Sequence, residues 1–175
     1  MITLSPERWK KYSSLYCLIE NFQAIDSRDD SDSVLRNFGF DFDLVDWHCH
    51  FDRFSGAIGC FISHYLLWEY TSQQNDWVLI LEDDVRVVDL DEFFRDYEID
   101  DSYELIKLNK RPGSIGADAY LLHSSGAKKI IKLCNKKITR PVDRFLWENA
   151  IEELSWKHDQ FIGLAGWCQK STLKK

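Results

Sequence analysis

The sharpest change from apolar to polar positions along the chain follows residue 81. Five apolar residues, Trp77 to Leu81, run without interruption into Glu82, Asp83 and Asp84. A run this short, preceded by turn-forming residues, predicts a strand that is buried on both faces, as in a parallel sheet. Because such strands present ligand-binding residues at their carboxyl ends, the three carboxylates mark a candidate site.

The rest of the chain alternates between helical and strand-like spacing of apolar positions. A helical period of three and four residues extends from Ile58 to Glu69. Further helices are expected from Ser5-Pro6 to about residue 18 and at 90–97, 124–133 and 144–154, strands at 22–26, 103–108 and 119–122, and a polar loop at 27–33. This alternation predicts a single α/β sandwich domain over residues 1–175, with a mostly parallel central sheet and helices on both faces.

Composition removes several classes of function. The net charge is -7 and the only basic run is the short segment Lys170–Lys175, so neither nucleic acid nor an anionic membrane surface is an expected partner. No apolar run reaches the length of a transmembrane segment and the opening residues lack a leader pattern, so a cytoplasmic location is expected. Five cysteines, an odd number without C-x-x-C spacing, predict reduced thiols.

The three adjacent carboxylates have two interpretations. Carboxylates this close repel one another by roughly 1 to 4 kcal/mol per pair, depending on the local dielectric. A divalent cation such as Mn²⁺ or Mg²⁺, which prefers hard oxygen ligands, would remove that repulsion. A solvated acidic turn is the alternative, and the tripeptide alone does not separate the two.

Other polar residues are weaker candidates. His48 and His50 would share one face of a strand, but two histidines without a second ligand pair predict packed or loop side chains rather than a metal site. Gly56 and Gly59, at the start of the helix that follows, allow close backbone approach of a ligand or of a neighbouring strand. His64, on the apolar face of that helix, is more typical of a hydrogen-bonded core histidine than of a catalytic group.

Several spaced motifs together resemble those of glycosyltransferase family 25, which includes lipooligosaccharide β-galactosyltransferases and collagen galactosyltransferases. The residues that carry the resemblance are Gly56-x-x-Gly59-Cys60-x-x-Ser63-His64, Ile80-Leu81-Glu82-Asp83-Asp84-Val85, Ala119-Tyr120-Leu121 with Gly126-Ala127-Lys128-Lys129, and Pro141-Val142-Asp143. The opening Ile2-Thr3-Leu4, Glu7-Arg8 and residues 22–26 resemble the nucleotide-binding signature of the same family. The resemblance therefore extends over nearly the whole chain.

The resemblance implies a GT-A-like, Rossmann-type fold and inverting transfer of a hexose, most commonly galactose, from a UDP-sugar to a hydroxyl of a glycan or glycolipid acceptor. It implies a role in lipooligosaccharide or surface glycan synthesis. The strand-end carboxylates then take the place of the Asp-x-Asp motif, with Asp84 and Glu82 as ligands of Mn²⁺ or Mg²⁺. His158 is a weak candidate for a further ligand.

The same resemblance assigns the remaining site residues. The nucleotide-sugar subsite is expected to comprise Arg8, Asp26, Gly56, Gly59, Ser63, His64, Glu82 and Asp83. Asp143 is the candidate catalytic base, because inversion needs one group that removes the proton of the acceptor hydroxyl. Alternatives are a helix-surface Arg8, a turn Asp26 and a helix-capping Asp143, and in the last case the search for a base moves to Asp118.

Two rival functions from other classes remain. A phosphatase of the haloacid dehalogenase type also places carboxylates after an apolar strand, but its nucleophile is an Asp with a second Asp two residues later. Glu82 occupies the first place of the only such pair here, which disfavours this class. The stronger rival is a non-catalytic or impaired module of the same fold that binds a sugar nucleotide or a protein.

Overall fold

The structure is a computed structural model that describes residues 2–3, 20–43, 54–83, 85–87, 93, 95–108, 116–159 and 164–165. Its helices are α2 (Ser31–Phe38), α3 (Phe54–Gln73), α5 (Ser124–Cys134) and α6 (Val142–Arg144), and α6 continues into a π-helical turn (Phe145–Asn149) and a 3₁₀ turn (Ala150–Glu152). Its strands are β1 (Ile2–Thr3), β2 (Phe22–Gln23), β3 (Asp41–Phe42), β4 (Trp77–Leu81), β5 (Arg86–Val87), β6 (Leu105–Lys107), β7 (Ala119–His123), β8 (Lys137–Ile138), β9 (Trp156–His158) and β10 (Leu164–Ala165).

A four-stranded sheet with the order β4-β7-β6-β9 lies at the centre of the described structure. The predicted α/β class is confirmed, but the expected predominance of parallel pairing is not found in this sheet. Strand β7 is antiparallel to both β4 and β6, and only β6 and β9 run parallel. The physical reason is the length of the connection between β6 and β7, because the eleven residues 108–118 are too few for the crossover helix that parallel neighbours require.

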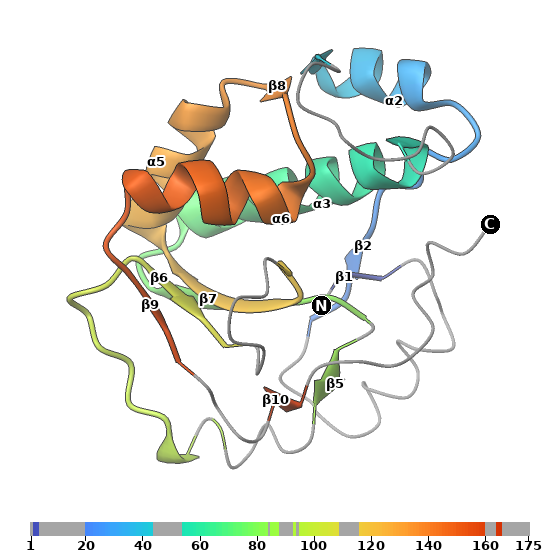
Figure 1. The fold of residues 1–175 in the computed structure, drawn as a ribbon. Helices are drawn as coiled ribbons and strands as arrows, with labels where there is room; N and C mark the ends of the chain where they lie inside the picture. Colours follow the sequence, from blue (N-terminus) through green and yellow to red (C-terminus); the bar gives the residue numbers. More distant parts are fainter. Residues whose placement is uncertain are drawn as a thin grey trace.

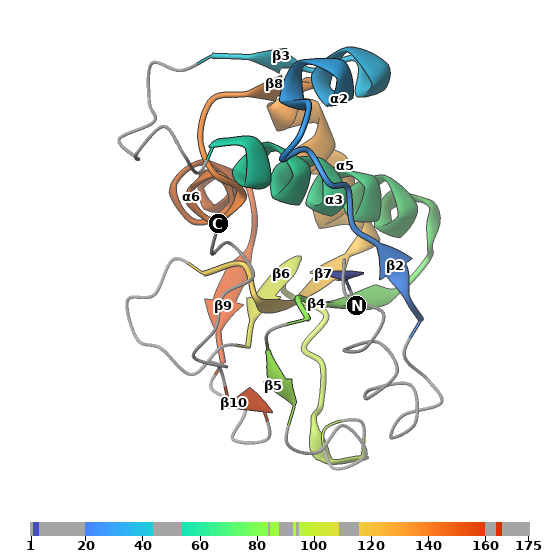
Figure 2. The ribbon, with the colours of Figure 1, turned by 90° about the vertical axis from the view of Figure 1, so that its right-hand side faces the viewer.

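Side chains alternate across the sheet, so its two faces have different cores. Helices α3, α5 and α6 all lie against one face, which we call the helix face (Figures 1 and 2). Ile80, Tyr120 and Leu122 point into the core of this face. Leu81 and Leu121 point into a second cluster on the opposite face, together with Phe93. A single strand such as β7 therefore supplies one residue to each core in turn.

Helix α3 is the main support of the helix face, and it was predicted from its spacing. It buries Phe61, Ile62 and Trp68 completely. At Gly59 the helix approaches the segment after β2 so closely that a Cβ atom would lie 2.3 Å from the carbonyl oxygen of Ile25. Glycine at this position therefore serves contact with a neighbouring segment, which is one of the two roles expected for it.

Two regions differ from the expected secondary structure. The segment 27–33 was predicted as a loop, but helix α2 begins within it because the side chain of Asp30 accepts the N–H of Ser33 as an N-cap. The predicted helix at 144–154 is present as the short series of α6, π and 3₁₀ turns. The helix expected from Ser5 and most of the helix expected at 90–97 lie outside the described residues.

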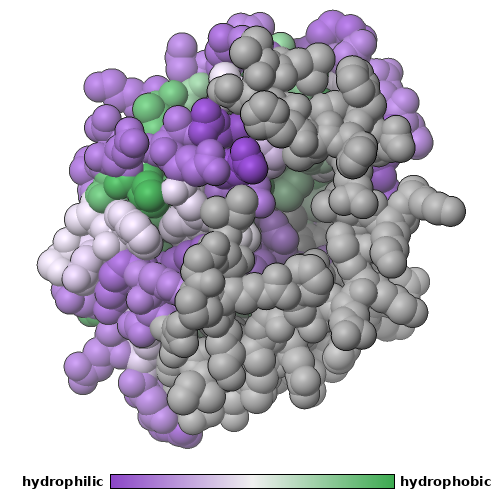
Figure 3. All heavy atoms as spheres, viewed as in Figure 1, coloured by the Kyte–Doolittle hydropathy of each residue, from purple (hydrophilic) through white to green (hydrophobic). Residues whose placement is uncertain are grey.

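The described residues on the face drawn in Figure 3 are mainly polar. Among these coloured residues, apolar areas form small separate patches. Among the described helices, none combines the length and the apolar composition of a membrane span. Both cysteines in the described part of the chain, Cys60 and Cys134, are free thiols. The other three cysteines lie outside the described residues.

Candidate active site

The candidate site lies where β4 ends, and the register of the sheet builds it. Leu81 is the last residue of β4 and pairs with Ala119, the first residue of β7. The ladder continues one step further, because the N–H of Glu82 donates to the carbonyl of Asp118 at 2.8 Å. Glu82 and Asp118 are therefore neighbours across two strands, although they are far apart in sequence.

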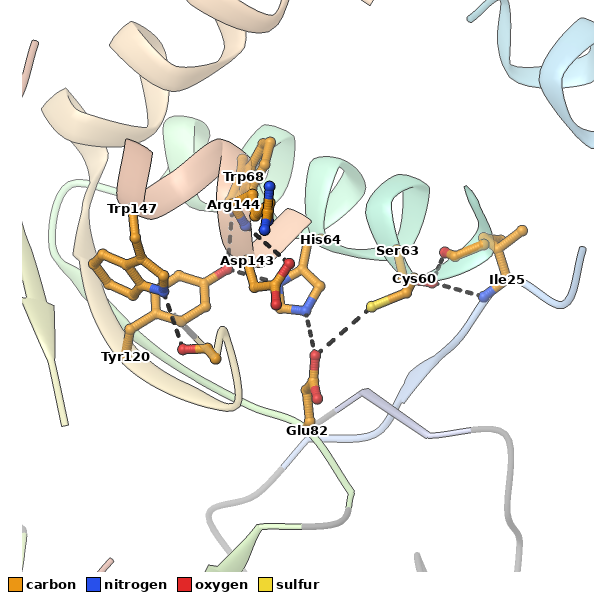
Figure 4. Close-up of polar contacts among 12 residues, drawn as sticks. Ile25, Cys60, Ser63, His64, Trp68, Glu82, Tyr120, Asp143, Arg144 and Trp147 are labelled. Atoms are coloured by element: carbon orange, nitrogen blue, oxygen red, sulfur yellow. Dashed lines mark hydrogen bonds and ion pairs between the residues drawn. The ribbon is translucent and has the colours of Figure 1, made fainter. Parts of the chain in front are cut away.

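A buried histidine from α3 holds the carboxylate of Glu82. The distance from His64 Nε2 to Glu82 Oε1 is 3.0 Å, and the Sγ atom of Cys60 lies 3.7 Å from the same oxygen. On the other side of the imidazole, Nδ1 lies 2.7 Å from the hydroxyl of Tyr120. That hydroxyl also accepts the indole N–H of Trp68 at 3.0 Å. Figure 4 shows this series of side chains running from the interior to Glu82.

Three of these side chains have ligand atoms close enough for one metal ion. Cys60, His64 and Glu82 each offer an atom, and all three atoms lie within 4.8 Å of one another. However, a thiol and an imidazole suit softer metals than the Mn²⁺ or Mg²⁺ that the sequence suggested. A hard cation fits this site through oxygen ligands, and Glu82 offers a carboxylate that is 28% exposed. Cys60 and His64 therefore hold Glu82 in place, and the carboxylate of Glu82 is the group of this cluster that a hard cation would bind.

A lysine inside the sheet adds a positive charge beside the carboxylates. Lys107 is only 4% exposed, and its Nζ atom lies 4.5 Å from the centre of the Trp147 ring. Burial lowers the pKa of Lys107, while the negative charges of Asp118 and Asp143 oppose that change. No ion pair of Lys107 within 4 Å occurs among the described residues. The ammonium group thus lies near two carboxylates without being joined to either.

Asp143 approaches the same place from α6. The N-cap of α6 is Pro141 and not Asp143, which lies inside the first turn. One carboxylate oxygen of Asp143 accepts the N–H of Arg144 at 2.8 Å. Burial raises the pKa of Asp143, and the nearby charge of Glu82 raises it further. A raised pKa in a half-buried carboxyl group is typical of a residue that exchanges protons with a substrate.

The motif residues of α3 are buried and have internal partners. Ser63 accepts the N–H of Ile25 at 2.8 Å and donates to the carbonyl of Gly59 at 2.7 Å. His64 is fully buried and both ring nitrogens have partners. Ser63, His64 and Gly59 therefore support the site from within, and the structure leaves none of them an open group for direct contact with a nucleotide sugar. Gly56 lies half-buried in the first turn of α3.

The other predicted site residues are less well connected to this cluster. Asp26 is exposed and forms a two-pronged ion pair with Arg28, which lowers the pKa of Asp26 to about 2. Asp83 is half-buried in the turn after β4, and His158 lies on β9 in register with Lys107. Arg8 and Asp84, and also His48 and His50, lie outside the described residues.

Sequence reasoning missed three contributors to the site: Lys107, Trp147 and Trp68. Lys107 carried a usable signal, because a lysine inside the apolar run Leu105 to Leu108 is costly to bury without a function. Trp147 packs against Lys107, and its indole N–H donates to the carbonyl of Gly116 at 3.0 Å. Nothing in the local sequence distinguishes Trp68 or Trp147 from an ordinary core aromatic residue.

Comparison with known proteins addresses the family directly. A model described as glycosyltransferase family 25 (LPS biosynthesis protein) matches residues 9–111, which is more than half of the chain. The chain belongs to glycosyltransferase family 25. The matched range includes α3 and the strand-end carboxylates, whereas Asp143 lies beyond it.

Members of family 25 from animals are similar to the chain over different lengths. A "Glycosyltransferase 25 family member" of Anopheles gambiae is 27% identical over 195 residues, which cover 90% of this chain and 32% of that protein. One from Aedes aegypti is 40% identical over 88 residues, which cover 46% of this chain and 14% of that protein. The mouse "Inactive glycosyltransferase 25 family member 3" is 30% identical over 151 residues, which cover 70% of this chain and 26% of that protein. The chain thus spans at most about a third of the length of these relatives.

Proposed function

We propose that this family 25 chain is an inverting glycosyltransferase that moves a hexose, galactose in the first instance, from a UDP-sugar to a hydroxyl of a glycan or glycolipid acceptor. Lipooligosaccharide or surface glycan synthesis is the process it would serve, and a cytoplasmic location remains a prediction. The observation that supports the proposal is the convergence of separate motifs. Glu82, from the strand end, is held by His64 from α3 and is close enough to Asp143 for its charge to raise the pKa of Asp143.

The strand-end carboxylates have the donor-binding role in this proposal. Glu82 would hold Mn²⁺ or Mg²⁺, together with Asp84. The cation would act as a Lewis acid on the diphosphate, whose negative charge grows as the bond to the sugar breaks. Arg8, Asp26 and Asp83 remain predicted contributors to nucleotide binding.

Asp143 has the acceptor-side role. A general base must be ionised before it can remove a proton from the acceptor hydroxyl, and a pKa raised toward neutrality makes it a stronger base once ionised. The ammonium group of Lys107 favours the ionised form through its positive charge. Asp118, whose backbone is paired with that of Glu82, is the alternative base.

A non-catalytic sugar-nucleotide-binding module is the second candidate function. The observation that favours it is the similarity to relatives named inactive, of which the human one is 30% identical over 151 residues covering 70% of this chain. Such a module would keep Glu82 and its supporting contacts but would not turn over a donor. Both candidates therefore predict binding of a UDP-sugar, and only the enzyme predicts its consumption.

The test measures donor binding and donor consumption separately. Isothermal titration with UDP-galactose and UDP-glucose, with and without Mn²⁺, should show cation-dependent binding that Glu82→Gln weakens at least tenfold. Release of UDP should follow in the presence of Mn²⁺ and a galactose- or glucose-terminated acceptor. Glu104→Gln is the matched control, because Glu104 is a carboxylate on the same sheet that bonds to Ser125 and Lys129.

The outcomes separate the candidates. Binding without UDP release, with every acceptor and also in hydrolysis, would favour the binding module. Absence of UDP-sugar binding at millimolar concentration would overturn both. Equal loss of binding in Glu104→Gln and Glu82→Gln would show that the effect is one of stability and not of the site.

A further inference from the structure

A continuous path of hydrogen bonds runs from the core to the site through four side chains, those of Trp68, Tyr120, His64 and Glu82. Trp68, Tyr120 and His64 are fully buried, and each has a polar atom within 3.0 Å of the next residue in the path. The path joins two elements of the fold, because Trp68 and His64 lie on α3 while Tyr120 lies on β7. Figure 4 shows it ending on one oxygen of Glu82.

The direction of every hydrogen in this path can be derived. The indole N–H of Trp68 can only donate, so the oxygen of Tyr120 accepts it. Burial raises the pKa of Tyr120 well above its ordinary value, so the hydroxyl keeps its own hydrogen. Its partner for that hydrogen is Nδ1 of His64 at 2.7 Å. Nδ1 is then an acceptor, the ring proton lies on Nε2, and Nε2 donates to Glu82.

The same logic fixes how Glu82 presents its carboxylate. Its Oε1 atom receives the N–H of His64 and the thiol of Cys60. The second oxygen has no hydrogen-bond partner among the described residues and points away from His64 and Cys60 in Figure 4. One oxygen is therefore held from inside, and the other is left for a ligand.

We propose that Trp68, Tyr120 and His64 are positioning residues, which act through their hydrogen bonds to orient Glu82 so that its second oxygen faces the donor and its cation. The inference rests on the proposed function of Glu82 and adds residues that act without touching a substrate. A side chain held by two donors loses less rotational freedom when it binds a ligand, so its affinity for the ligand is higher.

The competing interpretation is a metal site made by Cys60, His64 and Glu82 themselves. Cys60 and His64 are four residues apart on α3, a spacing that places two ligands on one helix face. In that arrangement Nε2 of His64 must be free of its proton, so the proton moves to Nδ1. The hydroxyl hydrogen of Tyr120 would then lose its acceptor inside the core, which leaves a buried donor unsatisfied. The structure therefore favours the positioning role.

The first experiment reads the position of the ring proton of His64 in the intact chain. Nitrogen-15 NMR of the imidazole distinguishes a proton on Nε2 from a proton on Nδ1. The proposal predicts the Nε2–H form in the wild type. In Tyr120→Phe, Nε2 keeps its proton because Glu82 still accepts it, whereas the chemical shift of Nδ1 moves to that of a nitrogen without a hydrogen-bond donor. A wild-type ring with its proton on Nδ1, or a ring unaffected by Tyr120→Phe, would overturn the proposal. This measurement needs neither a cation nor a donor.

The second experiment measures what the orientation contributes to cation binding. Tyr120→Phe removes one oxygen atom and should weaken Mn²⁺ binding about 5- to 30-fold, as expected for loss of one buried hydrogen bond behind Glu82. Tyr97→Phe is the matched control, because it removes a tyrosine hydroxyl that donates to Asp159 at 3.0 Å, outside the path. It should leave Mn²⁺ affinity unchanged. Equal weakening in the two variants would contradict the positioning role.

Zinc separates the remaining outcomes. Sub-micromolar binding of Zn²⁺ that Cys60→Ser abolishes would show that the three side chains form a metal site, and the positioning role would be wrong. If the wild type binds neither Mn²⁺ nor a UDP-sugar, the proposed function fails, while the NMR result still decides whether the hydrogen-bond path exists. Where Tyr120→Phe does not fold, the wild-type spectrum alone decides, because a ring proton on Nδ1 would contradict the path.

Discussion

The helix face and the opposite face of the central sheet use the same kinds of residues to different effect. Each face has a lysine over an aromatic ring. Lys107 lies over Trp147 on the helix face, and Lys157 lies 5.3 Å from the centre of the Tyr103 ring on the opposite face. The carboxylate nearest to Lys157 is Asp159, which it meets in an ion pair of 3.4 Å. The side chain of Lys157 is 25% exposed, so its positive charge is stabilised both by water and by the carboxylate of Asp159.

At Lys107 the charges are kept apart instead. Lys107 is almost fully buried and forms no ion pair within 4 Å among the described residues, although Asp118 and Asp143 are near. Charges that satisfy one another stabilise a fold, whereas buried charges that are held apart cost free energy unless a ligand completes them. We infer from the contrast that Lys157 has a structural role and that Lys107 serves the proposed ligand site.

The largest expected effect is a difference in turnover between variants of two aspartates, Asp143 at the site and Asp159 on the opposite face. Asp143→Asn removes the proposed base at nearly constant shape and should slow turnover by roughly 10²- to 10⁴-fold with little change in UDP binding. Asp159→Asn, on the opposite face, should leave turnover within about twofold, because the side chain of Asp159 bonds to Tyr97 and Lys157, which lie outside the site. Steady-state kinetics and titration with UDP provide both readouts. Near-normal turnover in Asp143→Asn would move the base to Asp118.

The two lysines should separate activity from stability. Lys107→Met removes a buried charge, and such replacements are often neutral or stabilising. It should nevertheless slow turnover tenfold to a hundredfold, because a positive charge several ångströms from a carboxylate contributes about 1–3 kcal/mol at an effective dielectric constant near 20. Thermal unfolding and kinetics would be measured on the same samples.

Lys157→Met is the control for this pair. It should lower the free energy of unfolding by about 0.5–1 kcal/mol through loss of the ion pair and the ring contact, and leave turnover unchanged. If both variants lose stability alike and neither loses activity, the two lysines play the same structural role and the contrast between the faces is wrong.

The two faces also differ in how far the sequence predicts them. The strand at 77–81, the helix at 124–133 and the helical period from Ile58 were predicted because one periodicity governs each of them. The carboxylates at the end of β4 were found for the same reason. The antiparallel pairing of β7 with β6 follows from the short connection between them, and the length of that connection can be read from the sequence.

The supporting contacts of the site could not be predicted from the sequence. The bond between His64 and Glu82 depends on how α3 lies over β4, and the bond between Tyr120 and Trp68 depends on the register of β7 under α3. Neither orientation is encoded in local spacing. His64 illustrates the consequence, since the prediction of a hydrogen-bonded core histidine is confirmed, while its role in a nucleotide-sugar site stays a prediction.

The smallest expected effect is a difference in how two carboxylates link stability to pH. Burial and the charge of Glu82 raise the pKa of Asp143 above its ordinary value of 3.8, so the folded state binds more protons there than the unfolded state does. Stability from this group is therefore present at low pH and is lost as the pH rises from about 4 through the folded pKa. Asp143→Asn should gain thermal stability relative to the wild type between about pH 4 and pH 7.

Glu104 should show the opposite sign and so complete this test. Burial alone would raise the pKa of Glu104, but hydrogen bonds from Lys129, Ser125 and the backbone of Ser155 outweigh it and lower the pKa from its ordinary value of 4.5. Its stabilising contribution is present above that value and is lost as the pH falls through the folded pKa. Glu104→Gln should therefore lose stability relative to the wild type as the pH rises, in scanning calorimetry across the same range. Equal signs for Asp143→Asn and Glu104→Gln would contradict the view that carboxylates at the site are held at a cost while those outside it stabilise the fold.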